Sequence, residues 1–565
     1  MEGIPRDPAV TAAAVLLRRL ARHGLDHLFV NAGTDFPPLI EAFCRLRAEG
    51  AALPRPVTAP HEHVALGLAH GHHLLSGRPQ AVMVHTNVGL ANAVIGTLNA
   101  ACDRVPLLLV SGRTPWSEGG RFGARTIPIN WGQEMRDQAA MVRESVKWDV
   151  ELRLPEQTAP LIDRALAIAR STPEGPVYLA LPREVLYGEV PPELRDPAPV
   201  QMPVRTVAEP AAVEEAARWL AEARRPLVVA QHGPRDPALF ARFADLVARF
   251  GLPVVSWWAT RCALPTDHPA QVGPDPTPFL AEADVVLVLD SLAPWAPDRH
   301  RPHPGARVIQ LGPDPLFSAV PVRTFPVHLG LAGESDATLA ALLDALEGTA
   351  GRVEAEWRTR TARAHRAWRR WLRERGRDDG RLTRGRVSRV LGALLARRPS
   401  SVFSELGAEY GVLARRAPDS WFQEPATGGL GWALPAATGA KLADPARDCV
   451  AVVGDGAYLF ADPPAAHRVA VAHGLAVLTV VLDNGAWGTV RRAVRELHPD
   501  GWAVRQNRMP MTDLGPARDL AALARACGLH AERVEEAHAL RPALARALAA
   551  TRAGEPALVQ VRIVD

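Results

Sequence analysis

The chain has 565 residues, 47% of them apolar, and this length predicts about three domains of ordinary size, roughly 100 to 200 residues each. Its 65 basic and 61 acidic residues leave a net charge of only +4, which argues against a nucleic-acid partner. The five cysteines form no CxxC pair and no apolar run approaches the roughly 20 residues that span a bilayer, so we expect a cytoplasmic protein with reduced thiols, no membrane contact and a small-molecule partner.

Short apolar runs alternate with longer helical patterns along the whole chain. Runs this continuously apolar are typical of parallel strands that helices cover on both faces. The predicted strands are, in chain order, 28–30, 82–84, 107–110, 177–181, 227–230, 285–289, 308–311, 450–453, 477–482 and 558–564. The expected fold class is therefore α/β, with three doubly wound domains whose sheets are mainly parallel.

Two stretches rich in proline and charge carry no plausible strand, and we place the domain boundaries there. They run from about 191 to 210 and from about 348 to 386. The expected domains are therefore residues 1–190, 207–347 and 380–565. In the second stretch Trp357, Trp368 and Trp371 recur near helical spacing, which predicts a linker helix that packs its tryptophans on the body of the protein rather than a nucleic-acid surface.

Two predicted strands near the C-terminus end in polar residues. The segment 450–456 ends in Gly-Asp-Gly, and the segment 477–484 ends in Asp-Asn. Ligands collect at the carboxyl ends of parallel strands, where glycines let the backbone approach phosphate oxygens. Asp455, Asn484 and the carbonyl of Ala486 offer hard oxygen ligands that suit Mg²⁺. The pattern predicts a site for a diphosphate and a divalent cation.

With these motifs the chain resembles the thiamine-diphosphate enzyme superfamily of acetolactate synthase and benzoylformate decarboxylase. That family's cofactor motif is Gly-Asp-Gly followed, after slightly under thirty residues, by Asn-Asn, and here the first Asn is Asp483. The segment 59–65, Ala-Pro-His-Glu-His-Val-Ala, resembles the family's His-Glu-x-x-Ala, so Glu62 matches the catalytic Glu. The segment 428–437 resembles the one that bends the cofactor, with Leu430 as the bending side chain. The resemblance covers essentially the whole chain.

The resemblance implies thiamine diphosphate and Mg²⁺ as cofactors and a role for each motif. Glu62 is expected to share a proton with the cofactor's aminopyrimidine ring, because a carboxyl group in an apolar pocket has a raised pKa. The implied metal ligands are Asp455, Asn484 and Ala486. The implied cofactor contacts are Gly428, Leu430, Gly454, Gly456, Ala457, Trp487 and Gly488. In the family the first and last domains meet across a subunit interface, so we expect a homodimer or homotetramer.

Two residues of the N-terminal domain are candidates for contact with the substrate. His85 aligns with an active-site histidine of benzoylformate decarboxylase, in a segment where acetolactate synthases carry a Ser-Gly-Pro-Gly type loop. A histidine that titrates near neutral pH can transfer protons after CO₂ is lost, while the alternative is a histidine that only caps a strand end. Thr34, after the first strand, either touches the substrate carboxylate or serves as a turn hydroxyl.

Several segments depart from the family pattern. Acetolactate synthases carry Met-Val-x-Gln-Trp where this chain reads Thr-Val-Arg-Arg-Ala at 489–493, which weakens that assignment. Glu405 is kept from the Glu-Ser-Thr run of benzoylformate decarboxylases, but the hydroxyls are absent. Arg491 and Arg492 could attract an anionic substrate, although exposed arginines on a helix need no function. Some relatives bind FAD in the central domain, but the reduced glycine turn at 232–234 does not favour a flavin here.

A cluster of five histidines precedes and occupies the helix expected after Glu62. They are His61, His63, His70, His72 and His73. No HExxH motif or cysteine accompanies them, so we expect most of them to be surface or supporting groups rather than metal ligands.

The function expected from the sequence is thiamine-diphosphate-dependent decarboxylation of a 2-oxo acid, a lyase reaction. Ligation of the product to an aldehyde or a second oxo acid is a further capacity. The alternatives are an acetolactate synthase-type carboligase, which is a transferase, and a non-catalytic homologue that serves as a binding subunit. Retention of Glu62 argues against the last of these.

Overall fold

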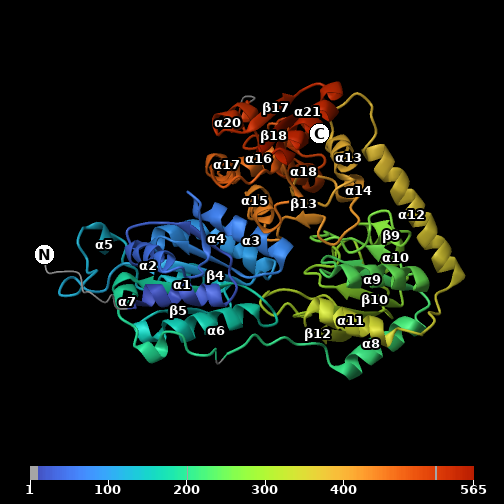
Figure 1. Cartoon of the computed structure of the whole chain (residues 1–565). Helices are drawn as coiled ribbons and strands as arrows, with labels where there is room; N and C mark the ends of the chain where they lie inside the picture. Colours follow the sequence, from blue (N-terminus) through green and yellow to red (C-terminus); the bar gives the residue numbers. More distant parts are fainter. Residues whose placement is uncertain (1–9, 200, 516–517, 565) are drawn as a thin grey trace.

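The structure, a computed structural model, describes residues 10–199, 201–515 and 518–564. Within these residues the chain forms three six-stranded sheets whose strands all pair in parallel. Figure 1 shows three lobes in chain order, the first blue to teal, the second green to yellow and the third orange to red. The expected α/β class with three parallel sheets is confirmed.

The first sheet has the strand order β2-β1-β3-β4-β6-β5. Its strands are β1 (His27–Asn31), β2 (Arg55–Thr58), β3 (Gln80–Val84), β4 (Leu107–Arg113), β5 (Asp149–Glu151) and β6 (Val177–Pro182). Its helices are α1 (Ala12–Arg22), α2 (Pro37–Ala48), α3 (Glu62–Ser76), α4 (Thr86–Cys102), α5 (Ile129–Gly132), α6 (Thr158–Arg170) and α7 (Arg183–Tyr187). One apolar core joins the sheet to α1, α2 and α6, and another joins its opposite face to α3 and α4. The inner strands are apolar along their length because both faces are buried.

The second sheet has the order β12-β11-β10-β7-β8-β9. Its strands are β7 (Pro226–Ala230), β8 (Val254–Val255), β9 (Gln271–Gly273), β10 (Val285–Leu289), β11 (Arg307–Gly312) and β12 (Leu329–Ala332). Its helices are α8 (Pro210–Glu222), α9 (Pro237–Phe250), α10 (Thr277–Leu280) and α11 (Ser335–Ala345). These elements share one apolar core, so the central lobe has its own hydrophobic interior.

The third sheet has the order β14-β13-β15-β16-β18-β17. Its strands are β13 (Ser400–Glu405), β14 (Trp421–Gln423), β15 (Asp448–Gly454), β16 (Leu478–Asp483), β17 (His530–Val534) and β18 (Ala557–Arg562). Its helices are α13 (Arg384–Leu395), α14 (Tyr410–Leu413), α15 (Ala433–Ala443), α16 (Asp455–Phe460), α17 (Pro463–Ala472), α18 (Gly488–Leu497), α19 (Trp502–Arg505), α20 (Leu520–Ala526) and α21 (Leu540–Arg552). Because β15 and β16 are neighbours, the two polar strand ends lie side by side, as expected.

The linker helix α12 (Ala355–Arg375) runs along the outside of the molecule between the second and third lobes (Figure 1). Trp357 is buried, with 2% of its surface exposed, and donates from its indole nitrogen to the carbonyl of Pro226 at 2.8 Å. Trp368 is half-buried, whereas Trp371 is 46% exposed and stacks on Trp368. The expectation that the helix packs its tryptophans on the body holds for Trp357 and Trp368 and is wrong for Trp371, because at this end of the helix Trp368 and Leu372 make the contact with the body, at Gly411.

The first and third lobes are joined by close packing of α3 against α15. A Cβ atom at Gly71 would lie 1.8 Å from the carbonyl oxygen of Ala436, and one at Gly439 would lie 1.9 Å from that of Leu68. The two helices can approach this closely only because glycine has no side chain. His63, His70, His72 and His73 are all buried, so of the two expected roles, surface or supporting groups, these four histidines fit the supporting one. Helix α3 lies between the first sheet and α15, and neither face is open to water.

Within the described ranges, no helix combines the length and the apolarity that crossing a bilayer requires. The bounds expected for the three domains, 1–190, 207–347 and 380–565, stay a prediction.

Candidate active site

A cavity of about 360 Å³ lies at the carboxyl ends of β15 and β16. All ten residues predicted from the C-terminal motifs line it. They are Gly428, Leu430, Gly454, Asp455, Gly456, Ala457, Asn484, Ala486, Trp487 and Gly488. Trp258 of the central lobe and Glu424 also line it. Three segments that are distant in the sequence therefore converge on one space.

The floor of this cavity concentrates oxygen atoms and negative charge. The carboxylate of Asp455 accepts a hydrogen bond from the backbone N–H of Gly485 at 2.8 Å. Burial, together with the nearby charge of Asp483, raises the pKa of Asp455 to about 6. The side-chain oxygen of Asn484 accepts the N–H of Ala486 at 3.1 Å. A carboxylate, an amide oxygen and a backbone carbonyl make a donor set that fits Mg²⁺ and the oxygens of a diphosphate.

The segment before α15 is shaped by a buried glutamate. Glu405, at the end of β13, accepts the backbone N–H groups of Gly431 at 2.6 Å and Ala433 at 2.8 Å. Just before these residues, Gly428 has a φ of 68° and no atom within 4 Å of a Cβ position, so the backbone there is open toward the cavity. Glu405 thereby fixes the turn that carries Leu430 into the cavity wall.

Glu424 is a cavity residue that the sequence analysis missed. Burial and the nearby charge of Glu405 raise the pKa of Glu424 to about 8, and burial raises the pKa of Glu405 to about 7. At neutral pH this pair therefore holds protons that exposed carboxyl groups would have lost. The sequence around Glu424 gives no sign of this, because the residue is buried by packing between distant segments.

Glu62 is the first residue of α3 and is only 6% exposed. The amide of Asn31, at the end of β1, donates to one carboxylate oxygen at 2.9 Å, and the amide of Asn92, on α4, donates to the other at 3.1 Å. Both oxygens of Glu62 are thus held by neutral amide donors that cannot take up its proton. Neither Asn31 nor Asn92 was singled out from the sequence as a partner of Glu62.

His85 and Thr34 line a second, much smaller cavity of about 10 Å³ in the first lobe. The amide of Gln133 donates to His85 Nε2 at 3.0 Å, and the Nδ1–H of His85 donates to the buried carboxylate of Asp35 at 2.5 Å. This chain of three side chains sets the tautomer and the orientation of the imidazole. Thr34 is exposed beside it, and its carbonyl accepts a hydrogen bond from Arg183.

Glu62, His85 and Thr34 do not line the cavity formed by the C-terminal motifs. The two regions are in contact within the chain, however. The ring of His63, next to Glu62, lies against the backbone of Leu430 and Gly431, and Asn99 donates to the carbonyl of Gly429 at 2.8 Å. The helix that begins with Glu62 therefore packs against the segment that contains Leu430.

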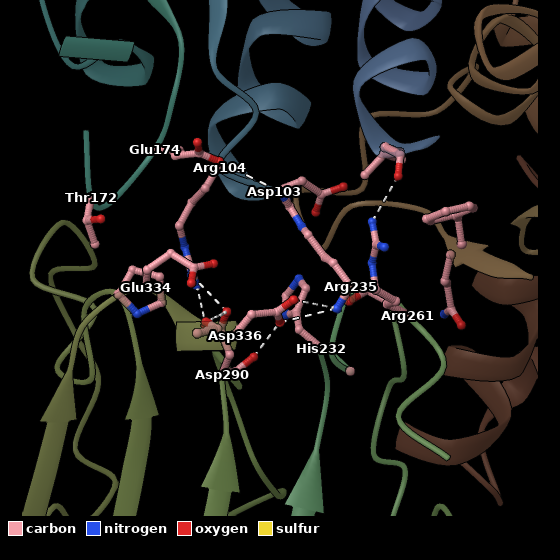
Figure 2. Close-up of a pocket in the computed structure, with 17 residues that line it drawn as sticks. Asp103, Arg104, Thr172, Glu174, His232, Arg235, Arg261, Asp290, Glu334 and Asp336 are labelled. Atoms are coloured by element: carbon pink, nitrogen blue, oxygen red, sulfur yellow. Dashed lines mark hydrogen bonds and ion pairs between the residues drawn. The ribbon is translucent and has the colours of Figure 1, made fainter. Parts of the chain in front are cut away.

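A third cavity, of about 80 Å³, lies where the three lobes meet, beside the 232–234 turn of the central lobe. Figure 2 shows Arg104, from the first lobe, reaching down to Asp290 beyond the central strands. The guanidinium of Arg104 donates to both carboxylate oxygens of Asp290, at 2.6 and 3.0 Å. Arg261 donates to the carbonyl of Leu74 and lies over the ring of Phe422. Side chains from all three lobes thus meet at this junction.

Comparison with known proteins gives a consistent result for all three lobes. Three family descriptions match: "Thiamine pyrophosphate enzyme, N-terminal TPP binding domain" over residues 10–141, the central domain of the same enzymes over 213–342, and their C-terminal TPP binding domain over 405–561.

Two related proteins and one solved structure each match most of this chain. Benzoylformate decarboxylase of Pseudomonas aeruginosa is 28% identical over 561 residues, covering 96% of this chain and 97% of the relative. A protein of the same species named probable 2-ketoarginine decarboxylase is 30% identical over 475 residues. This match covers 81% of this chain and 79% of the relative. The solved structure of the thiamine diphosphate-dependent 4-hydroxybenzoylformate decarboxylase of Rhodococcus jostii RHA1 matches this one with a TM-score of 0.76 at 22% identity. The match covers 98% of this chain and 99% of that protein, so the two share the fold.

Proposed function

Because this chain belongs to the thiamine pyrophosphate enzyme family, we propose that it decarboxylates a 2-oxo acid with thiamine diphosphate and Mg²⁺. The proposal rests on one observation above the others, the gathering of ten motif residues around a single cavity. When bound, the cofactor supplies a nucleophilic carbon and an electron sink for the bond to the carboxylate.

Each group of residues has a task in this proposal. Asp455, Asn484 and the carbonyl of Ala486 would hold Mg²⁺, while the glycines around Asp455 let the backbone approach the diphosphate. Leu430 would press the cofactor into its bent form. Glu62 would share a proton with the aminopyrimidine ring, and its two amide donors keep the carboxyl group in place without competing for that proton.

His85 would move protons at the substrate carbon after CO₂ leaves. Asp35 orients the imidazole through Nδ1, so Nε2, which faces Gln133, is the nitrogen that can exchange a proton. Thr34 lies beside His85 at the same small cavity, where it would contact the substrate carboxylate.

A second copy of the chain completes the proposed site. Glu62 and His85 belong to the first lobe and do not line the cavity of the third lobe in the same chain. In a homodimer, the first lobe of one copy would close over the third lobe of the other. A homodimer or homotetramer is therefore part of the proposal.

The replacement Glu62→Gln tests the role of the carboxyl group. The variant should bind thiamine diphosphate as the unaltered protein does and lose at least about 100-fold in kcat, the usual scale for loss of a general acid–base group. Cofactor binding is measured by calorimetric titration in the presence of Mg²⁺, and turnover by CO₂ release. Glu41→Gln, at an exposed position on α2, is the control and should keep full activity. Undiminished turnover in Glu62→Gln would refute the proposed role.

Product analysis separates the proposed lyase from the alternatives. With pyruvate alone, acetaldehyde supports decarboxylation with release, whereas acetolactate supports a carboligase of the acetolactate synthase type. A protein that binds the cofactor but converts no member of a broad 2-oxo acid panel, with or without an added aldehyde, would instead be a non-catalytic homologue.

A further inference from the structure

A second large cavity adjoins the one that holds the cofactor motifs. Its volume is about 570 Å³, and five arginines line it: Arg375, Arg381, Arg384, Arg492 and Arg495. No acidic residue is among its lining residues in the described part of the chain. We refer to this space as the arginine chamber. An open cavity with one sign of charge concentrates ions of the opposite sign.

The arginine chamber borders the cofactor cavity. Arg384 and Gly488 line both spaces. Gly488 begins α18, whose residues Arg492 and Arg495 lie one helical turn apart and so on the same face. The other arginines come from the end of α12, the start of α13 and the loop between them. Three separate parts of the fold therefore place positive charge beside the cavity of the cofactor motifs.

Ion pairing does not account for most of this charge. Arg375 pairs with Glu409, and Arg491, the neighbour of Arg492 on α18, pairs with Asp513 outside the chamber. Within the described ranges, the side chains of Arg381, Arg492 and Arg495 form no ion pair with a carboxylate. Like charges in a shared cavity repel, and an anion bound among them relieves that repulsion. Guanidinium groups match the planar and tetrahedral oxyanions best.

We propose that the arginine chamber binds a second anionic group of the substrate, a carboxylate, sulfonate or phosphate distant from the reacting carbonyl. This rests on the proposed function, since the anion is carried by the 2-oxo acid. The cofactor's diphosphate has its own place at Asp455 and Asn484 in the neighbouring cavity. A simple 2-oxo acid has only the carboxylate beside its carbonyl, and that group is needed at the reacting centre. The chamber therefore selects dianionic substrates.

The test compares acids that differ only in the distal charge. 2-Oxoglutarate and its 5-methyl ester have the same carbon chain and the same 2-oxo acid group, but the ester carries no distal charge. Oxaloacetate and 2-oxoadipate vary the distance between the two charges. For at least one length we expect the dianion to have a kcat/KM roughly 10- to 100-fold above its neutral counterpart, the effect of one or two charge-assisted hydrogen bonds. 3-Sulfopyruvate and 3-phosphonopyruvate identify the preferred oxyanion.

The double variant Arg492→Gln/Arg495→Gln should abolish that preference and leave the turnover of the neutral acid within about 3-fold of the unaltered protein. Arg505→Gln, an exposed arginine on α19 that does not line the chamber, is the matched control and should keep the preference. An equal loss for both acids, or no preference in the unaltered protein at any chain length, would overturn the inference.

Calorimetric binding keeps the two proposals apart. The same acids are titrated into the protein loaded with thiamine diphosphate and Mg²⁺, with and without the double substitution. A binding preference for dianions that disappears in the variant supports the chamber even if no acid is turned over, in which case the proposed decarboxylation fails alone. Turnover without any dianion preference supports the decarboxylation and rejects the chamber.

Discussion

Asp483 shows how one departure from the family pattern is accommodated at the level of single residues. The family has an asparagine here, and the added carboxylate lies close enough to Asp455 to raise its pKa. Arg562 of the neighbouring strand β18 pairs with Asp483 at 2.7 Å, and Gln560 donates to its other oxygen at 2.8 Å. The positive charge of Arg562 offsets the extra negative charge, so the site tolerates the substitution.

The ten residues predicted from the C-terminal motifs line one cavity because they belong to contiguous motifs at strand ends, while their roles stay a prediction. The sequence did not predict Arg562, Glu424, Asn31 or Asp35 as partners, although Asn31 and Asp35 are close to Thr34 in the chain. Each of these side chains meets its partner through strand pairing or helix packing, and such pairings leave no local pattern in the chain. Residues that hold the motif residues in place are therefore the part of the site that only the fold shows.

Glu424 leads to a prediction about pH. Burial and Glu405 raise its pKa to about 8, so the folded protein binds this proton more tightly than the unfolded chain, whose glutamates titrate near pH 4.3. Stability should therefore fall as pH rises through this interval. The side chain at residue 424 stays neutral at every pH in Glu424→Gln. Between about pH 5 and 8 this variant should therefore lose less free energy of unfolding than the unaltered protein, by on the order of 2 kcal/mol at pH 8.

The measurement is the midpoint of thermal unfolding at several pH values, with cofactor absent. Glu214→Gln, at an exposed position on α8, should reproduce the pH curve of the unaltered protein. If the curve of Glu424→Gln runs parallel to that of the unaltered protein, the carboxyl group at residue 424 does not hold its proton in the folded state.

At the scale of helices and strands, the sequence predicted the interior of each sheet better than its edges. All ten predicted strands are present in the described chain, and all of them are flanked by strands on both sides. The six edge strands, β2, β5, β9, β12, β14 and β17, were not predicted. Most of these edge strands are short and partly exposed, so sequences such as Arg-Pro-Val-Thr in β2 lack a continuous apolar run. The inner strands β8 and β13 were missed because the first has two residues and the second contains three serines and a glutamate.

The close packing of α3 on α15 makes Gly71 a critical position. In an isolated helix Gly71→Ala would be favourable by about 1 kcal/mol. Here the added methyl group would lie 1.8 Å from a backbone oxygen of α15, which cannot move without separating the helices. Overpacking of this kind costs roughly 1–3 kcal/mol or more, so the substitution should lower stability by about 2 kcal/mol net and reduce activity, because Glu62 begins the same helix.

Denaturant unfolding and turnover of Gly71→Ala are compared with those of Gly132→Ala. Gly132 ends α5, where no atom lies within 4 Å of the Cβ position, so this control should be as stable as the unaltered protein. Equal stability of the two variants would show that α3 and α15 are not held at the distance seen here.

On the scale of the whole molecule, the three lobes are fixed to one another by contacts that no periodicity in the sequence reveals. Composition and motif order predicted three α/β units, but not their junction. There Arg104 of the first lobe meets Asp290 of the second, and Arg261 of the second contacts the first lobe at Leu74 and the third at Phe422 (Figure 2).

Removal of Arg104 should loosen this junction. Burial alone would raise the pKa of Asp290, but the charge and hydrogen bonds of Arg104, together with His232 and Ser335, outweigh burial and hold that pKa at about 2. Arg104→Gln leaves the Asp290 carboxylate without its cation, which should destabilise the fold by roughly 2–4 kcal/mol at neutral pH. A carboxyl group whose pKa is lowered by folding stabilises the fold at pH values above its unfolded pKa, near 3.9. That contribution is lost as pH falls toward 2, so the difference in free energy of unfolding between Arg104→Gln and the unaltered protein should shrink below about pH 4.

Calorimetric unfolding should resolve an early transition in Arg104→Gln. The double variant Arg104→Gln/Asp290→Asn should largely remove this transition, because it leaves no unpaired charge. Arg18→Gln, which breaks an exposed pair with Glu49, is the control and should unfold as the unaltered protein does. A single unchanged transition in Arg104→Gln would mean that the lobes are held together without this pair.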